Sequence, residues 1–225
     1  MKKVFINQKG FWGDIIFIMA ILQKYHKDGY EVIYPLPNQY IEPISVKNYF
    51  PTINIISQNG YRQKNFINEG DEVTNLDFHR IYGKHQISGH MRFKYEDLDL
   101  PLDMWRDVEI TRNHDAETRL FDYLELSDGK KYNFINEFWH GKNTGLLVET
   151  GNDYPNINMS FIEGFTLFDW ILVMQRAQSI HTVSTSINFF IDLYDMPDDL
   201  HIYKRGAQTN HDEYDFLFNK NYVWH

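Results

Sequence analysis

The first 36 residues read as a strand, a glycine-containing loop, an apolar helix and a second strand. A short apolar run over residues 4–6 predicts the first strand, and residues 31–36 predict the second. Between them, the apolar stretch over residues 14–22 ends in basic residues and Gly29, which are helix-stop signals. A strand–helix–strand unit implies a parallel sheet with a right-handed crossover. We therefore expect an α/β fold.

A second alternation of helices and strands occupies the C-terminal half. It predicts a helix, a strand, a helix and a strand, over residues 166–177, 180–183, 187–194 and 201–203. Thr166 and Asp169 form a capping-box-like pair at its start. Residues 151–158 predict a turn-rich loop, whereas residues 85–95 are ambiguous. Because the sequence changes character near residue 113, we predict two domains, residues 1–112 and 113–225.

The composition excludes several classes of protein. The chain has no cysteine among its 225 residues, which rules out disulfides, thiolate metal sites and a cysteine nucleophile. Its net charge of −9 repels a phosphate backbone, so we expect no nucleic-acid binding. The longest apolar run is too short to span a bilayer, and polar residues interrupt any signal-like start. We expect a cytoplasmic protein without a transmembrane segment.

The spacing of the histidines and the share of aromatic residues also bear on function. His79, His85 and His90 lack the spacing of metal ligands, so no metal is expected. The aromatic share of 16% is high. An aromatic core is one explanation, and a surface that contacts sugars or partner proteins is the other.

The first candidate site is the loop of residues 10–14, between the first strand and the first helix. Backbone amides at a helix N-terminus attract anions, and glycine lets a ligand approach closely. Trp12 and Gly13 are therefore candidate binding residues. Asp14 would lie at the carboxyl end of the strand, where a carboxylate can accept a proton from a substrate hydroxyl. Capping of the helix is the alternative role of Asp14.

The second candidate site is the predicted strand-to-helix turn of Ser184, Thr185 and Ser186. Three hydroxyl groups can bind a phosphate or a ribose together with the backbone amides. Capping is again the alternative, although a single hydroxyl achieves it. His181, near the start of the strand, is a further candidate binding residue, and its alternative is a histidine packed in the core.

A third candidate site is the loop of residues 136–142. Lys142 can pair with a phosphate and Glu137 with a hydroxyl, and His140 lies between them in the sequence. A solvated loop without a ligand is the alternative for this segment.

Two of these segments together resemble the heptosyltransferase-like family of glycosyltransferases (ADP-heptose:LPS heptosyltransferases), which have the GT-B fold. Residues 13–16 and 20–22 are similar to the family's N-terminal segment, in which the first strand ends in Gly-Asp. Residues 181–188 are similar to its C-terminal donor-binding segment. That segment typically reads Asp-Thr-Gly, with a His shortly after. Here residues 184–186 are Ser-Thr-Ser, and Phe189 takes the place of the His.

The resemblance implies a shortened GT-B-like protein with two small Rossmann-like domains that face a cleft. Residues 1–112 would bind the acceptor, and residues 113–225 the nucleotide-sugar donor. It implies hexosyl or heptosyl transfer to a hydroxyl with inversion, Asp14 as general base, and neither a metal nor a cofactor. Two alternatives remain open. One is a non-catalytic nucleotide- or glycan-binding protein on the same scaffold, and the other is a different Rossmann-type enzyme or an interaction module.

Overall fold

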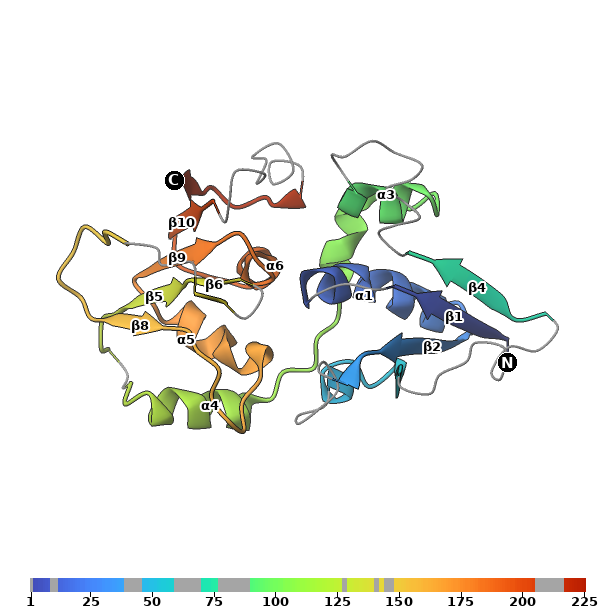
Figure 1. Ribbon diagram of the computed structural model, residues 1–225, viewed down its shortest axis with the longest axis horizontal. Helices are drawn as coiled ribbons and strands as arrows, with labels where there is room; N and C mark the ends of the chain where they lie inside the picture. Colours follow the sequence, from blue (N-terminus) through green and yellow to red (C-terminus); the bar gives the residue numbers. More distant parts are fainter. Residues whose placement is uncertain are drawn as a thin grey trace. The chain divides into compact units, whose positions relative to one another are not determined.

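The computed structural model describes residues 2–8, 12–38, 46–58, 70–76, 90–126, 129–139, 142–143, 148–204 and 217–225. The chain divides into two compact units, residues 1–111 and 112–225. Each unit contains its own parallel sheet and its own helices (Figure 1). The predicted α/β class is therefore confirmed in both halves of the chain.

The N-terminal unit is built on a four-stranded sheet in the order β3-β2-β1-β4, and all pairings are parallel. Its elements are β1 (Lys3–Asn7), α1 (Trp12–Lys27), β2 (Glu31–Leu36), η2 (Val46–Asn48), β3 (Asn54–Ser57), β4 (Glu72–Asn75), α3 (His90–Glu96) and η4 (Leu102–Asp107), where η denotes a 3-10 helix. The predicted strand–helix–strand unit is β1-α1-β2. Because the strands are parallel, their carboxyl ends meet at one edge of the sheet, where ligands of such folds bind.

Helix α1 lies in the core of this unit. Residues 15–23 are all buried, and the helix packs against β2, α3 and η4. Apolar residues around the whole circumference are typical of such an enclosed helix. The ring of Phe17 meets that of Tyr95 edge-on, with centroids 4.9 Å apart. Gly29 follows the helix with a φ of +90°, a conformation that favours glycine and ends the helix as predicted.

The C-terminal unit is built on a five-stranded parallel sheet in the order β11-β10-β9-β5-β8. Its elements are α4 (His114–Tyr123), β5 (Asn133–Asn136), β6 (Phe138–Trp139), β7 (Lys142–Asn143), β8 (Asn156–Asn158), η5 (Leu167–Trp170), α5 (Ile171–Gln175), β9 (Ser179–Val183), α6 (Ile187–Leu193), β10 (Asp199–Tyr203) and β11 (Val223–Trp224). Strands β6 and β7 form a separate antiparallel pair. The strands β5, β9 and β10 form the centre of this sheet, and the hydroxyl-rich turn follows the carboxyl end of β9.

Two expectations differ from the structure in this unit, and one strand was not expected. The predicted loop over residues 151–158 contains β8, whose Asn156 Oδ1 accepts a hydrogen bond from Asn133 Nδ2 at 3.0 Å. Pairing with β5 thus compensates for the low strand propensity of asparagine. The helix predicted over residues 166–177 is divided into η5 and α5, although the Asp169 carboxylate does accept a hydrogen bond from the Thr166 N–H. The strand β11 was not predicted from the sequence.

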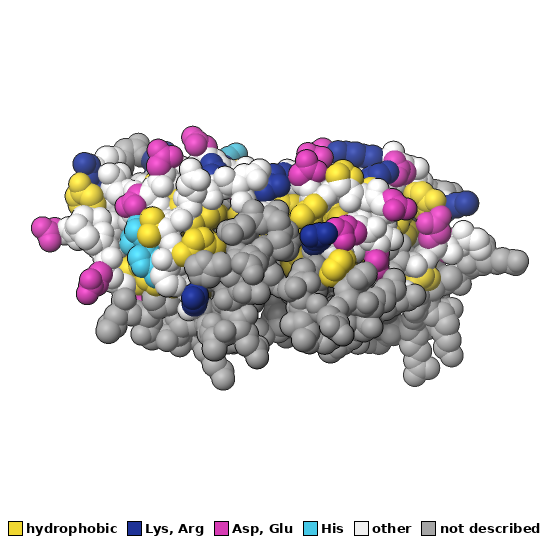
Figure 2. Space-filling model, turned by 90° about the horizontal axis from the view of Figure 1, so that it is seen from above, with side chains coloured by type: hydrophobic (Ala, Val, Ile, Leu, Met, Phe, Trp, Pro, Cys, Tyr) yellow, Lys and Arg dark blue, Asp and Glu magenta, His cyan; other side chains and the backbone are white. Residues whose placement is uncertain are grey.

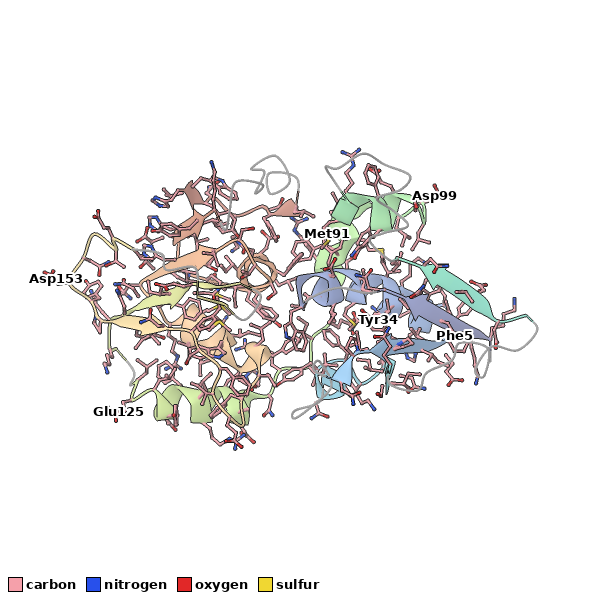
Figure 3. All side chains as sticks on the ribbon, in the orientation of Figure 1. Phe5, Tyr34, Met91, Asp99, Glu125 and Asp153 are labelled. Atoms are coloured by element: carbon pink, nitrogen blue, oxygen red, sulfur yellow. The ribbon has the colours of Figure 1, made fainter. Side chains whose placement is uncertain are left out.

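Aromatic side chains fill much of both cores, whereas Tyr123, Phe138, Tyr154 and Phe161 are exposed. Phe5 and Tyr34 lie in the N-terminal sheet (Figure 3). The largest fully buried side chains also include Trp105, Trp170, Tyr49, Tyr95, Tyr132, Phe17, Phe50, Phe134 and Phe168. On the outside, acidic and basic side chains are interspersed over the face seen in Figure 2. In the part of the chain that the structure describes, no helix has the length and apolar character that crossing a membrane requires.

Candidate functional site

Asp14 lies in the first turn of α1, the helix that follows the carboxyl end of β1. Trp12, Gly13 and Asp14 are all partly exposed, whereas the helix is buried from Ile15 onward. Gly10 and Phe11, the other residues of the predicted loop, lie outside the described residues. A negative charge in the first turn is stabilised by the helix dipole. The Asp14 carboxylate is thus held at the edge of the sheet where an α/β protein binds ligands.

A buried lysine contacts this carboxylate. The Nζ of Lys94 donates a hydrogen bond to Asp14 Oδ1 at 2.7 Å. The side chain of Lys94 is 0% exposed, and that of Asp14 is 20% exposed. A buried ammonium group needs an anionic partner, and Asp14 provides it. This pair could not be predicted from the sequence, because Lys94 lies in the ambiguous segment of residues 85–95, 80 positions from Asp14.

Helix α3 is fixed against α1 by the residue next to Lys94. The hydroxyl of Tyr95 donates a buried hydrogen bond to the backbone oxygen of Phe17 at 2.6 Å. Burial raises the pKa of Tyr95 well above its ordinary value, so the hydroxyl stays protonated and remains a donor. The position of Lys94 beside Asp14 is therefore set by helix packing.

In the C-terminal unit, three polar side chains meet at the carboxyl ends of β5 and β9. The Nδ2 of Asn136 donates hydrogen bonds to Thr182 Oγ1 at 2.9 Å and to Thr185 Oγ1 at 3.1 Å. Asn136 and Thr182 are buried, whereas Thr185 is partly exposed. Asn136 ends β5 and was not singled out from the sequence. Its amide connects the strand ends to the hydroxyl-rich turn.

The three hydroxyl residues of the turn have different surroundings. Ser184 is buried, and its N–H donates to the Tyr203 carbonyl at 3.2 Å. Thr185 and Ser186 are partly exposed. Ser186 precedes α6, yet its side chain makes no capping hydrogen bond. Within the described ranges, the Ser186 hydroxyl has no hydrogen-bond partner, so it can bind a ligand without giving up a protein contact.

Asn188 supports the turn from inside. Its Oδ1 accepts a hydrogen bond from the Thr185 N–H at 2.9 Å, which fixes the orientation of the amide. The Nδ2 of Asn188 is buried, and no residue that the structure describes accepts a hydrogen bond from it. Such an unsatisfied donor costs about 1–3 kcal/mol. The Asn188 amide therefore ties the turn to α6 and leaves one buried donor beside it.

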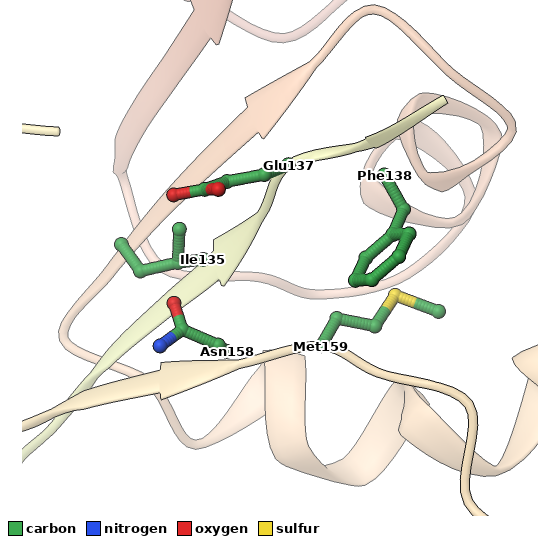
Figure 4. A pocket seen from close by; sticks show the side chains of 5 residues that line it. All are labelled: Ile135, Glu137, Phe138, Asn158 and Met159. Carbon is green, nitrogen blue, oxygen red and sulfur yellow. The ribbon is translucent and has the colours of Figure 1, made fainter. Parts of the chain in front are cut away.

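A small pocket opens at the carboxyl ends of β5 and β8. It has a volume of about 150 Å³ and is lined by Ile135, Glu137, Phe138, Asn158 and Met159. Phe138 and Met159 lie together on one side, and Glu137 and Asn158 are the polar members of the lining (Figure 4). The pocket thus combines an apolar wall with a carboxylate and an amide.

The remaining candidates of the third loop are only partly described. Lys142 lies in β7, where its backbone is opposite Trp139 of β6. His140 lies outside the described residues. The binding roles predicted for both residues stay predictions. No group of three or more His, Asp or Glu side chains is arranged to hold a metal ion in the described part of the chain.

His181 occupies the centre of a buried polar network. Its Nδ1 lies 3.1 Å from the Tyr203 hydroxyl, and its Nε2 lies 3.0 Å from the Ser179 hydroxyl. Burial, and to a smaller extent the neighbouring His201, lower the pKa of His181 to about 4. The imidazole is therefore neutral at pH 7 and bonded through both nitrogens. This environment favours the packed role of His181 over contact with a ligand.

Comparison with known proteins identifies solved structures that have a similar fold. No family model and no curated protein matches the sequence. One similar solved structure is a glycosyl transferase family 9 protein from Veillonella parvula DSM 2008, with a TM-score of 0.55 and 10% identity over 99% of this chain and 86% of that one. The chain shares the fold of a glycosyltransferase. The resemblance implied an α/β fold of two units, each with a parallel sheet, and this fold is thereby confirmed.

A second similar structure belongs to the same functional class. It is the iron-containing dodecameric glycosyltransferase TibC from enterotoxigenic E. coli H10407, with a TM-score of 0.54 and 10% identity. The match covers 90% of this chain but only 58% of TibC. At this identity the likeness establishes the fold, and the chemistry has to be argued from this chain's own residues.

Proposed function

We propose that the protein is a glycosyltransferase that moves a sugar from a nucleotide-diphosphate sugar to an acceptor hydroxyl. The observation that carries the proposal is the position of Asp14. It is a partly exposed carboxylate at the carboxyl end of β1, paired with a buried ammonium group, in a protein with the fold of glycosyltransferases. The ammonium group stabilises the ionised form, which a general base requires.

The proposed reaction is a direct displacement. The acceptor hydroxyl loses its proton to the Asp14 carboxylate while its oxygen attacks the anomeric carbon. The bond from that carbon to the phosphate oxygen breaks, and the nucleoside diphosphate leaves with the bonding electrons. Because attack and departure take place on opposite faces, the anomeric configuration inverts. Neither a metal nor a cofactor has a part in this mechanism.

The C-terminal unit is the proposed donor side. Ser186 and Thr185 are partly exposed and would bind phosphate oxygens. The hydrogen bonds of Asn136 and Asn188 hold the turn in place for this contact.

The other candidate residues would have supporting roles. Glu137, at the nearby pocket, would accept a hydrogen bond from a ribose or sugar hydroxyl. Lys142 and His140 would balance the negative charge of the leaving diphosphate. Ser184 and His181 would support the turn from below, and Trp12 and Gly13 would contact the acceptor.

One observation favours a second candidate function, a binding protein without catalysis. Phe189, at the place where the family has a His, is buried and packs edge-on against Phe218 at 5.2 Å. A side chain in the core cannot interact with a substrate. The alternative is therefore a nucleotide- or glycan-binding protein on the same scaffold.

Two measurements distinguish these functions. The first is the thermal shift of the protein with ADP, UDP, GDP and their sugar conjugates, since a ligand of the native state raises the melting temperature. The second is the rate of sugar release from each conjugate by the wild type and by Asp14→Asn. Catalysis is supported if turnover is lost in the variant while the thermal shift is kept. A shift without turnover supports the binding protein, and the absence of any shift counts against both functions.

A further inference from the structure

We propose that Lys94 is a positioning residue for Asp14, which holds the carboxylate in its ionised form and aims it from the first turn of α1. The inference rests on the proposed function of Asp14 as general base. It adds a residue from a different helix to the site, on the evidence of a hydrogen bond of 2.7 Å between Lys94 Nζ and Asp14 Oδ1.

The burial of Lys94 is difficult to explain by stability alone. Its side chain is 0% exposed, and among the described residues Asp14 provides the one polar contact of the ammonium group. Removing an ammonium group from water is costly, and an apolar side chain in place of a buried ion pair is often as stable. A buried charge with a single partner is therefore better explained by its effect on that partner.

The positions of the two side chains show from which side Lys94 acts on Asp14. Asp14 keeps 20% of its side chain exposed, whereas Lys94 is fully buried, so the ammonium group approaches the carboxylate from the protein interior. The Tyr95 hydroxyl fixes α3 to α1 one residue away. The cation is thus supplied from the side of the core and not from the solvent.

Other charged or titratable groups lie on the elements packed against α1. They are His90, Arg92, Tyr95 and Glu96 on α3, Asp103, Arg106 and Asp107 on η4, and Glu31 and Tyr34 on β2. Arg92 forms an exposed pair with Glu96, and the Arg106 guanidinium lies 4.7 Å from the centre of the Trp105 ring. Arg92 therefore offers a matched control, because it is a cation on the same helix whose ion pair is at the surface.

The test compares Lys94→Met with Arg92→Met in the full chain. The probes are UDP-glucose, GDP-mannose and ADP-glucose, each with water as the acceptor, and the readout is kcat and KM for the donor that the wild type hydrolyses. We expect Lys94→Met to lower kcat about tenfold or more with little change in KM, because general-base catalysis contributes about 10²–10⁴-fold. Arg92→Met keeps the wild-type kcat. A wild-type kcat in Lys94→Met overturns the proposal.

A second readout does not depend on turnover. Aspartate labelled with ¹³C at the carboxyl carbon reports the ionisation of Asp14, and the Asp14→Asn variant assigns its signal. We expect the titration midpoint of this signal to move to higher pH in Lys94→Met and to stay in place in Arg92→Met, because the nearby cation favours the charged form. An unchanged midpoint overturns the inference even if the wild type is active.

The failure of the proposed function is distinguishable from the failure of this inference. If no donor is hydrolysed, the proposed function fails, and a shifted midpoint still supports Lys94 as the group that keeps Asp14 ionised. If Lys94→Met does not fold, Lys94→Gln replaces it in both measurements.

Discussion

The Tyr203 hydroxyl lies 3.1 Å from His181 Nδ1, and this contact completes a buried chain of hydrogen bonds through the imidazole. The Ser179 hydroxyl donates to Asn133 Oδ1 at 2.8 Å, so it is left to accept a hydrogen bond from His181 Nε2–H. Nδ1 then accepts from Tyr203. The neutral imidazole satisfies every group in this chain of hydrogen bonds, which joins β5, β9 and β10. A second proton on His181 would force the Tyr203 hydroxyl to change from donor to acceptor.

The first prediction is that acid destabilises the C-terminal unit. The pKa of His181 is lowered to about 4, so the unfolded state binds a proton below pH 6.5 while the folded state does not. The free energy of unfolding should fall by about 3 kcal/mol between pH 7 and pH 4 from this group. Urea unfolding monitored by hydrogen exchange of the β9 and β10 amides measures it. His225, whose pKa is also lowered, acts in the same direction.

The control for this prediction is His181→Gln, which keeps a polar side chain but does not titrate. Its free energy of unfolding should be lower at pH 7 and depend less on pH between 4 and 6.5. A variant with the same slope as the wild type would show that other groups cause the acid sensitivity.

The second prediction concerns the hydrogen bond between α3 and α1. Tyr95→Phe removes the hydroxyl that donates to the Phe17 carbonyl but keeps the ring that packs on Phe17. It leaves a buried carbonyl without its donor, so we expect a loss of about 1–3 kcal/mol in the free energy of unfolding. Chemical denaturation at pH 7 measures this. Tyr123→Phe is the matched control, because the Tyr123 side chain is exposed, and it should leave the stability unchanged.

Local patterns were sufficient to predict much of the fold. The spacing of apolar residues and the glycine after Lys27 predicted β1, α1 and β2, and the same reasoning located β9 and α6. Strand β8 was not predicted, because it is stabilised by pairing with β5 and by a hydrogen bond from the Asn133 amide. The asparagine-rich sequence of residues 151–158 indicates neither interaction. Elements that exist because of distant partners carry little local signal.

In the site too, residues marked by a local sequence pattern could be predicted, whereas residues brought together by packing could not. Asp14 and Ser186 could be found because they follow strands, where a parallel sheet places its ligands. Lys94 could not be found, since only the packing of α3 on α1 brings it to Asp14. Asn136 and Asn188 likewise become relevant only when the ends of β5 and β9 are adjacent.

The third prediction tests a buried ion pair at the start of the C-terminal unit. The Arg112 guanidinium donates to both carboxylate oxygens of Glu117, which is buried, and this hydrogen bonding raises the pKa of Arg112. Arg112→Leu removes the cation that is hydrogen-bonded to the buried Glu117 carboxylate and leaves, among the described residues, only the exposed His114, whose Nδ1 lies 3.7 Å from Glu117 Oε2. We expect a loss of about 3–5 kcal/mol. Arg112→Leu combined with Glu117→Leu should recover much of it. A double variant no more stable than the single one would mean that packing of Arg112, and not its charge, is what the unit needs.

The fourth prediction tests the donor side, and Ser186 is the residue for it. Its hydroxyl makes no capping hydrogen bond and is partly exposed, so Ser186→Ala should leave the melting temperature of the free protein unchanged. The ligand for this test is the nucleoside diphosphate that raises the melting temperature of the wild type. If the turn binds its phosphate, the thermal shift should be smaller in Ser186→Ala, because the complex loses a hydrogen bond that contributes about 0.5–1.5 kcal/mol. Ser160→Ala, an exposed serine of the same unit, is the control and should keep the full shift. An equal shift in Ser186→Ala and wild type would place the diphosphate elsewhere and leave Asp14 as the only part of the proposed site with support.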